Sequence, residues 1–200
     1  MKAIEIIEKK LEIKDIELPV LKDNEVLIKV KAAGLNRADI AQKNGLYPPP
    51  AGESEILGLE CSGIIESIGK NVSSKKPGDD VIALLAGGGY AEYVTCPEHQ
   101  AILKPQKLSW AEGASIPEVY ATCWLNLFIE AHMKEGDKIV FHAGASGIGT
   151  AGIQLAQAFG CDSFVSAGTQ EKIDFCLNLG ASAGEIRSKD IFSKIKEWSP

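Results

Sequence analysis

The sequence predicts an α/β protein in which a strand-rich first part precedes the beginning of a doubly wound parallel sheet. Three observations lead to this prediction. Up to about residue 117, short alternating segments are separated by turn residues, and from residue 121 helical and strand patterns alternate. Residues 141–160, FHAGASGIGTAGIQLAQAFG, run from the end of one strand through a glycine-rich turn into a helix. We place the domain boundary near residue 118, which predicts one domain over residues 1–118 and another over residues 119–200.

The first part is expected to consist of short strands and turns. The clearest strand is EVLIKVKAAG, in which Val26, Ile28 and Val30 recur at every second position. Further strand candidates are KAIEII, SGIIESIG, VIALL and YAEYVTC, at residues 2–7, 62–69, 81–85 and 90–96. The segments NGLYPPPAG, KKPGDD and AGGGY break helices and indicate loops between these strands.

The second part alternates helices and strands. Helices are expected at 121–133, after the glycine turn and at 170–180, and strands at 138–143 and 163–168. A short strand at 184–187 and a helix at 190–198 complete the pattern. A dinucleotide fold has two mononucleotide halves, and these elements supply only the first. We therefore expect this sequence to be the front part of a longer enzyme, with the second half of the nucleotide domain absent.

The glycine turn predicts a dinucleotide site. Gly144, Gly147, Gly149 and Gly152 satisfy GxxGxG and GxGxxG in overlapping frames. First-turn amides of a helix lack intrahelical partners and can bind a pyrophosphate. A glycine-rich turn without a ligand is the alternative. The expected cofactor-binding residues here are Gly144, Ala145, Ser146, Gly147, Ile148 and Gly149, and the Ser146 hydroxyl faces the ligand or caps the helix.

Composition excludes several classes of protein. A net charge of −6 and a pI near 5.2 disfavour nucleic-acid and anionic-membrane partners. No apolar run reaches membrane-spanning length and no signal peptide is recognisable, so we expect a cytoplasmic protein. Five widely spaced cysteines and three histidines form no metal-ligand pattern, which predicts reduced thiols and no metal site.

The second nucleotide-domain strand indicates which nicotinamide cofactor is used. NAD sites usually place an acidic residue at its end, where the carboxylate binds the ribose 2′-hydroxyl. Here the strand ends with Gly168 and Thr169, Gln170 follows, and Lys172 lies just beyond. Hydroxyl and amide donors with a nearby cation suit a 2′-phosphate. We therefore expect NADPH as the cofactor.

The chain resembles the zinc-free, zeta-crystallin-like quinone oxidoreductases of the medium-chain dehydrogenase/reductase superfamily, and among them the tumour-suppressor-inducible type. Segments that carry this resemblance include AAGLNRADI, GLYPPPAG, ILGLECSGII, ALLAGGGYAEYV, IPEVYATCW and HAGASGIGTAGIQLA. The resemblance implies a GroES-like catalytic domain followed by a Rossmann domain, and a homodimer in the complete enzyme. The zinc alcohol dehydrogenases of the same superfamily have cysteine and histidine zinc ligands where this chain has Asn36 and Leu59. The resemblance therefore also implies no metal.

The resemblance also implies site residues. It places Asn36 and Thr122 near the nicotinamide, matches Gly168 and Lys172 to NADPH contacts, and puts Arg187 where the family has a tyrosine. The alternatives are that Asn36 caps a turn and that Thr122 is a helix-start hydroxyl.

Three residues are candidates for a role near the chemistry: Tyr47, Asn36 and Ser146. The Tyr47 phenol can hydrogen-bond a quinone oxygen, and the alternative is a surface-loop aromatic. We expect Glu60 to be a buried, paired carboxylate without a catalytic role.

The expected activity is NADPH-dependent reduction of a small-molecule quinone or enone. No residue looks like an obligatory acid, base or nucleophile, which fits hydride chemistry, where the cofactor performs the reaction and the protein positions the reactants. Two alternatives stay open: an enoyl thioester reductase, and a non-catalytic, crystallin-like NADPH-binding protein.

Overall fold

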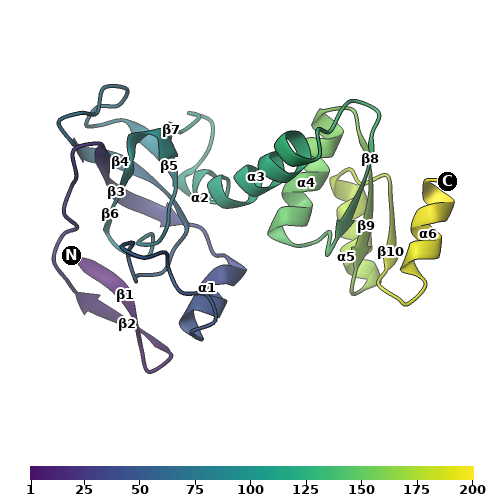
Figure 1. Ribbon diagram of the computed structural model, residues 1–200, viewed down its shortest axis with the longest axis horizontal. Coiled ribbons are helices and arrows are strands. Elements are labelled where there is room, and N and C mark those ends of the chain that lie inside the picture. Colours follow the sequence, from purple (N-terminus) through teal and green to yellow (C-terminus); the bar gives the residue numbers. More distant parts are fainter. The chain divides into compact units, whose positions relative to one another are not determined.

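The computed structural model describes residues 1–200 as two compact units, Met1–Glu118 and Val119–Pro200 (Figure 1). The first unit is built on antiparallel strands and the second on parallel ones. None of the helices combines the length and the apolar composition that a membrane-spanning helix needs.

The first unit contains two sheets. Its elements are β1 (Lys2–Ile7), β2 (Lys10–Asp15), β3 (Glu25–Ala33), α1 (Arg37–Lys43), β4 (Glu60–Ile68), β5 (Asp80–Leu84), β6 (Tyr93–Pro97), the 3₁₀-helix η1 (Glu98–Gln100), β7 (Ala101–Leu103) and α2 (Trp110–Ala114). Five strands form an antiparallel sheet in the order β6-β3-β4-β5-β7, and β1 pairs with β2 in a separate hairpin.

The core of the first unit forms on one face of the five-stranded sheet. Val26 and Ile28 of β3 are fully buried, as are Cys61 and Val81 on the next two strands. Because side chains alternate between the faces of a strand, the period-two pattern of β3 places its apolar residues on this face. Two register shifts between β3 and β4 mark bulges, which bend and twist a sheet.

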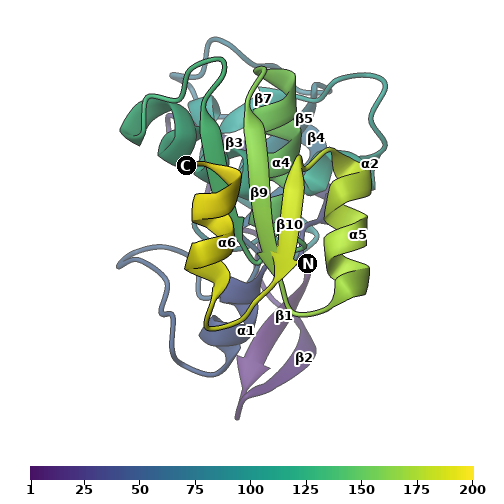
Figure 2. The ribbon, with the colours of Figure 1, turned by 90° about the vertical axis from the view of Figure 1, so that its right-hand side faces the viewer.

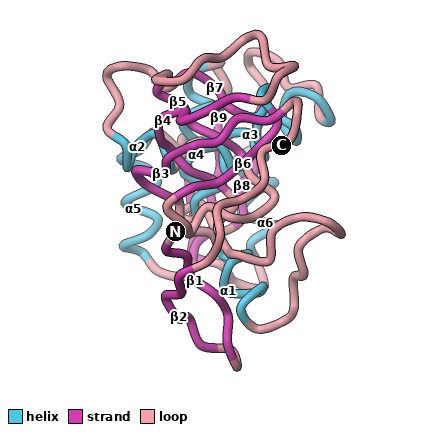
Figure 3. The backbone as a smooth tube through the Cα atoms, turned by 90° about the vertical axis from the view of Figure 1, so that its left-hand side faces the viewer, coloured by secondary structure: helices cyan, strands magenta, loops and turns pink.

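The amino-terminal hairpin is tied to a distant part of the sequence. The Ile4 amide donates to the Tyr90 carbonyl at 2.9 Å, and the Glu92 amide donates to the Lys2 carbonyl at 3.0 Å. Ala3 forms an isolated antiparallel bridge with Ala91 between these bonds. Figure 3 shows the hairpin, in magenta, ending in the tight β1–β2 turn.

The second unit is a three-stranded parallel sheet with helices. Its elements are α3 (Pro117–Trp124), which begins two residues before the division, the π-helix η2 (Leu125–Glu130), β8 (Lys138–His142), α4 (Gly147–Ala158), β9 (Asp162–Ala167), α5 (Gln170–Leu179), β10 (Ala183–Ile186) and α6 (Ile191–Trp198). The strand order is β10-β9-β8, and both pairings are parallel.

Helices cover both faces of this sheet. Val165 and Ala167 of β9 pack in one core with residues of α4 and α5, including Ile153 and Ile173. Phe164, which alternates with Val165, contacts Trp198 of α6 with ring centroids 5.6 Å apart. Successive strand residues face opposite ways, so α6 lies on the face opposite α4 and α5 (Figure 2).

The expected fold class is confirmed, and most elements lie where the pattern predicted them. Five short elements were not predicted: β2, α1, η1, β7 and α2. The helix expected to begin near residue 121 begins at Pro117 and continues into a π-helix. Proline suits the first helical position because its missing N–H would have no partner there.

Candidate functional site

The glycine turn joins β8 to α4 and has the predicted geometry. Ser146 is the N-cap residue of α4, and its hydroxyl oxygen accepts a hydrogen bond from the Gly149 amide at 3.1 Å. The Gly144 amide donates to the Ser166 carbonyl of β9 at 2.9 Å. These two bonds hold the turn against the carboxyl ends of the parallel strands.

Three amides of the turn are available to a ligand. The backbone N–H groups of Ala145, Gly147 and Ile148 donate to no group of the chain, and Gly147 and Ile148 are exposed. They lie at the start of a twelve-residue helix, where the helix dipole also favours an anion. The turn therefore offers unpaired donors where a pyrophosphate binds in dinucleotide folds.

The glycines of the turn are needed mainly by the protein itself. A Cβ on Gly149 would lie 2.6 Å from the Gly144 Cα, one on Gly152 would lie 2.6 Å from the Phe141 Cζ, and one on Gly144 would lie 2.7 Å from the Val165 Cβ. Real Cβ contacts essentially never come this close. Close packing of the turn, α4 and the sheet thus explains three glycines that the motif alone attributes jointly to ligand and packing.

Ala143 precedes the turn in a left-handed conformation with φ of 56°. This region disfavours residues that carry a Cβ. Outliers of this kind cluster at ligand-binding turns. The conformation connects the end of β8 to the amide-rich turn.

The end of β9 leaves open space and carries no acidic residue. A Cβ on Gly168 would meet no atom within 4 Å. Thr169 is the N-cap residue of α5, and its hydroxyl oxygen accepts from the Lys172 amide. The Arg187 amide donates to the Ala167 carbonyl at 2.8 Å, which holds Arg187 beside this strand end. Lys172 and Arg187 are exposed and form no ion pair within the chain.

One detail of the expected cofactor site requires correction. Thr122 is not a helix-start hydroxyl, because α3 begins at Pro117 and Thr122 lies within it, with its carbonyl accepting from the Asn126 side chain. The Gln170 side chain donates one N–H to the Asp174 carboxylate at 2.8 Å, which leaves its second N–H for a ligand. The approach of Thr122 to a nicotinamide stays a prediction.

In the first unit, Asn36 forms hydrogen bonds with other residues of the chain. It is the N-cap residue of α1, and its backbone N–H donates to the Asp39 carboxylate at 2.7 Å. Its side-chain Nδ2 donates to the Glu60 Oε1 at 2.8 Å. One side-chain N–H of Asn36 is therefore already engaged, and the second N–H and the carbonyl oxygen are what it can offer to a ligand.

Asp39, Tyr90 and Glu118 extend this polar group, which the motif analysis did not single out. The Tyr90 hydroxyl donates to the Asp39 Oδ2 at 2.7 Å, and the other Asp39 carboxylate oxygen is buried without a hydrogen-bond partner. The Glu118 amide donates to the Glu60 Oε2 at 2.9 Å. These contacts join residues distant in sequence, so no local pattern indicates them.

Tyr47 lies on the loop after α1 and makes no hydrogen bond to this polar group. It is 50% exposed and forms no side-chain hydrogen bond. The exposed position agrees with the surface-aromatic alternative, and its contact with a quinone stays a prediction.

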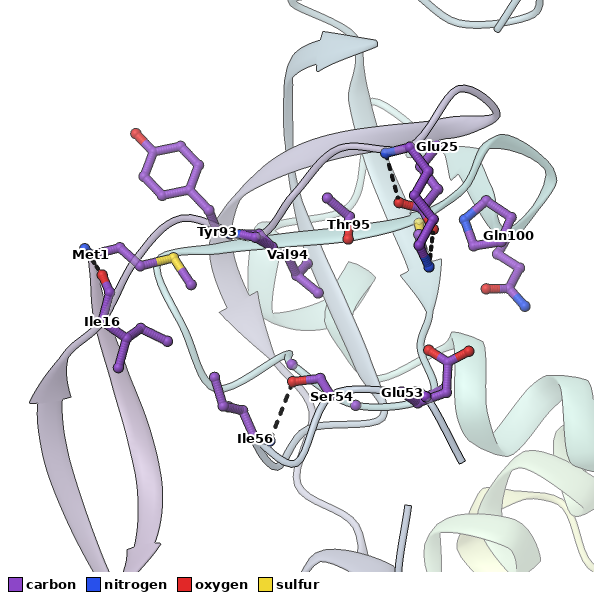
Figure 4. A pocket seen from close by; sticks show the side chains of 18 of the residues that line it. Met1, Ile16, Glu25, Glu53, Ser54, Ile56, Tyr93, Val94, Thr95 and Gln100 are labelled. Atoms are coloured by element: carbon purple, nitrogen blue, oxygen red, sulfur yellow. Dashed lines mark hydrogen bonds and ion pairs between the residues drawn. The ribbon is translucent and has the colours of Figure 1, made fainter. Parts of the chain in front are cut away.

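A cavity of about 430 Å³ in the first unit is lined in part by residues 52–54 and 86–88 (Figure 4), of which Gly52 and residues 86–88 belong to the two predicted loops. Met1, Ile16 and Ile56 contribute apolar surface, and the paired Lys22 and Glu25 contribute charge. Neither Asn36 nor Tyr47 lines this cavity. The candidate site residues of this unit therefore lie elsewhere.

The cysteines show no sign of a redox pair. All five are buried and unpaired, and burial raises the pKa of the Cys96 thiol to about 12. Such thiols carry little thiolate, the reactive form, at neutral pH. The structure contains no group of three or more His, Cys, Asp or Glu side chains placed to hold a metal ion.

Comparison with known proteins identifies relatives of both units. The family model of the alcohol dehydrogenase GroES-like domain matches residues 22–106. A quinone oxidoreductase from Sus scrofa is 37% identical over 185 residues, covering 92% of this chain and 56% of that protein. The chain thus spans about half the length of the curated relatives it matches.

Solved structures give the same result. Escherichia coli quinone oxidoreductase complexed with NADPH superimposes with a TM-score of 0.86 at 27% identity, covering 100% of this chain and 63% of that chain. The CurK enoyl reductase superimposes with a TM-score of 0.88 at 28% identity, covering 99% of this chain and 63% of that one.

Proposed function

The chain belongs to the quinone oxidoreductases of the medium-chain dehydrogenase/reductase superfamily, and from this membership we propose that it supports NADPH-dependent reduction of a quinone or related enone. NADPH, when bound, supplies the hydride. The observation that carries the proposal is the turn with three unpaired amides at the start of α4. The expected homodimer and cytoplasmic location stay predictions.

The residues of the second unit fit a dinucleotide. The amides of Ala145, Gly147 and Ile148 would hold the pyrophosphate, and the Ser146 hydroxyl can donate to it while its oxygen caps α4. The open space beside Gly168 would accommodate the adenosine ribose.

A 2′-phosphate fits the strand end better than a free 2′-hydroxyl does. No carboxylate occupies the position at which NAD sites bind the ribose, since Gly168 and Thr169 stand there. Lys172 and Arg187 have no ion-pair partner in the chain and are available to a phosphate. Glu171 opposes this charge from the first turn of α5, where it is exposed. Two unpaired cations against one exposed carboxylate support NADPH.

The experiment is a binding and turnover measurement. Titration calorimetry should give tighter binding of NADPH than of NADH, and NADPH oxidation should accelerate when a simple quinone is added. Equal affinity for both cofactors would refute the 2′-phosphate assignment. Tight NADPH binding with no turnover on quinones or enones would favour the non-catalytic, crystallin-like alternative.

An enoyl thioester reductase is the second candidate function, because the CurK enoyl reductase is as similar in structure as the quinone oxidoreductases are. The two activities share the cofactor and differ in the acceptor. Comparing kcat/KM for a simple quinone with that for a short enoyl thioester separates them, and a higher value for the thioester would select the second candidate.

A further inference from the structure

Glu60 lies at the centre of the polar group in the first unit. It is 2% exposed, and both of its carboxylate oxygens accept hydrogen bonds. Oε1 accepts from the Asn36 side chain at 2.8 Å, and Oε2 accepts from the Glu118 amide at 2.9 Å. Glu60 therefore connects a candidate site residue with the point where the chain enters α3.

The backbone makes room for this carboxylate. A Cβ on Gly34 would lie 2.6 Å from the Glu60 Cγ and would also overlap Oε1. The Gly34 amide in turn donates to the Glu60 carbonyl at 3.3 Å. Two residues before Asn36, the chain thus has a glycine against which the Glu60 side chain fits.

No cation compensates the buried charge. The titratable groups around Glu60 are Asp39 of α1, Tyr90, Glu118 of α3 and Cys61 of its own strand, and none of them carries positive charge. No lysine, arginine or histidine forms an ion pair with Glu60. A desolvated carboxylate beside other carboxylates costs folding free energy.

The hydrogen bonds explain why a carboxylate is needed. The Asn36 Nδ2 and the Glu118 amide are both donors, and one neutral glutamine side chain offers a single acceptor oxygen. With glutamine at this position, the Glu118 amide keeps its acceptor only if the Asn36 amide turns to face the glutamine NH₂ with its oxygen. Only the ionised carboxylate accepts from both donors and keeps Asn36 in its present orientation.

We propose that Glu60 is a positioning residue, which fixes the side-chain orientation of Asn36 through an uncompensated buried charge and thereby lowers the stability of the fold. The link to activity rests on the proposed function, because Asn36 is the residue expected at the nicotinamide end. The orientation of Asn36 and the cost in stability do not depend on that function.

The sign of the pH dependence follows from the charge. Burial raises the pKa of Glu60 above its ordinary value of 4.5, while the Glu118 amide and Asn36 lower it and Asp39 raises it further. The folded state then holds the proton more tightly than the unfolded state does. As the pH rises from the ordinary value through the raised folded pKa, ionisation of Glu60 therefore lowers the free energy of unfolding.

The test compares the Glu60→Gln variant with the Glu66→Gln variant in the cofactor-free protein. Glu66 lies on the same strand, is exposed and forms no side-chain hydrogen bond. We expect Glu60→Gln to melt no lower than the unaltered protein at neutral pH, with the difference in Tm growing as the pH rises above the ordinary glutamate value. The side-chain amide signal of Asn36 in NMR spectra should shift with acidification in the unaltered protein and not in Glu60→Gln.

Activity supplies an independent reading. The Glu60→Gln variant should lose about tenfold or more in kcat/KM, the size of one charge-assisted hydrogen bond, while Glu66→Gln keeps the original value. A Glu60→Gln protein that melts lower or does not fold would overturn the proposal, because the carboxylate would then be structural. An Asn36 signal that does not change with pH in the unaltered protein would also overturn it, and an unchanged kcat/KM in Glu60→Gln would overturn the link between the orientation of Asn36 and activity. If the unaltered protein neither binds NADPH nor reduces quinones, the proposed function fails, and Tm and the Asn36 signal still decide the role of Glu60.

Discussion

Replacing Gly149 with alanine should destabilise the second unit because the new methyl group meets backbone. The added Cβ would lie 2.6 Å from the Gly144 Cα, and it would overlap the carbonyl of the same residue. A side chain could rotate away, but here the turn itself must move, which also shifts the amides of Ala145 and Gly147.

The magnitude follows from two opposing terms. Overpacking costs about 1–3 kcal/mol, and a backbone obstacle favours the upper end. Alanine in place of glycine in a helix raises the free energy of unfolding by up to about 1 kcal/mol. The net loss is about 2 kcal/mol, which lowers Tm by roughly 8–16 °C in a domain of 60–100 residues.

The matched control is the Gly168→Ala variant, since a Cβ there meets nothing within 4 Å and Gly168 does not require a left-handed backbone. Its Tm should stay the same or rise slightly, because alanine reduces the entropy of the unfolded chain. Both variants are compared by circular dichroism and calorimetry without cofactor. A Gly149→Ala protein that melts within about 2 °C of the unaltered one would refute the packing argument.

Three further predictions concern the nucleotide end. Lys172→Glu should weaken the binding of NADPH by about 1.5–3 kcal/mol, the size of a hydrogen bond to a charged group, and leave the binding of NADH nearly unchanged. Titration calorimetry measures both affinities, with Lys196→Glu as the control. An equal loss of affinity for the two cofactors would show that Lys172 is structural. Ser146→Gly should lower the free energy of unfolding by only a few tenths of a kcal/mol, and Ser146→Ala by about 1 kcal/mol. Both variants should weaken the binding of NADPH equally if the hydroxyl binds it. Unchanged affinity for NADPH would leave Ser146 as a helix cap only. Ala143→Gly should stabilise the unit by about 0.5–1 kcal/mol, because relief of the left-handed strain exceeds the added entropy of the unfolded chain; a lower Tm would contradict this.

Strong local patterns made much of the fold predictable. The alternation in β3 and the apolar helix after the glycine turn gave elements close to those observed. Short elements were missed: α1 has seven residues, and in β2 the apolar Leu11 and Ile13 are exposed, so their alternation marks no buried face. Such segments depend on tertiary contacts, which override weak local preference.

The candidate site was predictable where one stretch of sequence contains it. Ser146 and the amides after it are neighbours in the chain, and the motif identifies them. The motif attributes Gly149 and Gly152 jointly to ligand and packing, and it does not identify the backbone and ring atoms that lie opposite them. The Glu60 contacts with Asn36 and Glu118 span 24 and 58 residues, and only the folded chain brings them together.

The pairing of β1 with residues 90–92 imposes an order on events during synthesis. The ribosome releases the amino terminus first, at roughly 5–20 residues per second, so the hairpin waits several seconds for its partner segment to emerge. Throughout that interval the Ile4 amide and the Lys2 carbonyl lack the bonds that they make in the finished protein. A nascent chain stalled before residue 90 should therefore expose its first strand to chaperones and proteases, and one stalled well beyond residue 92 should protect it.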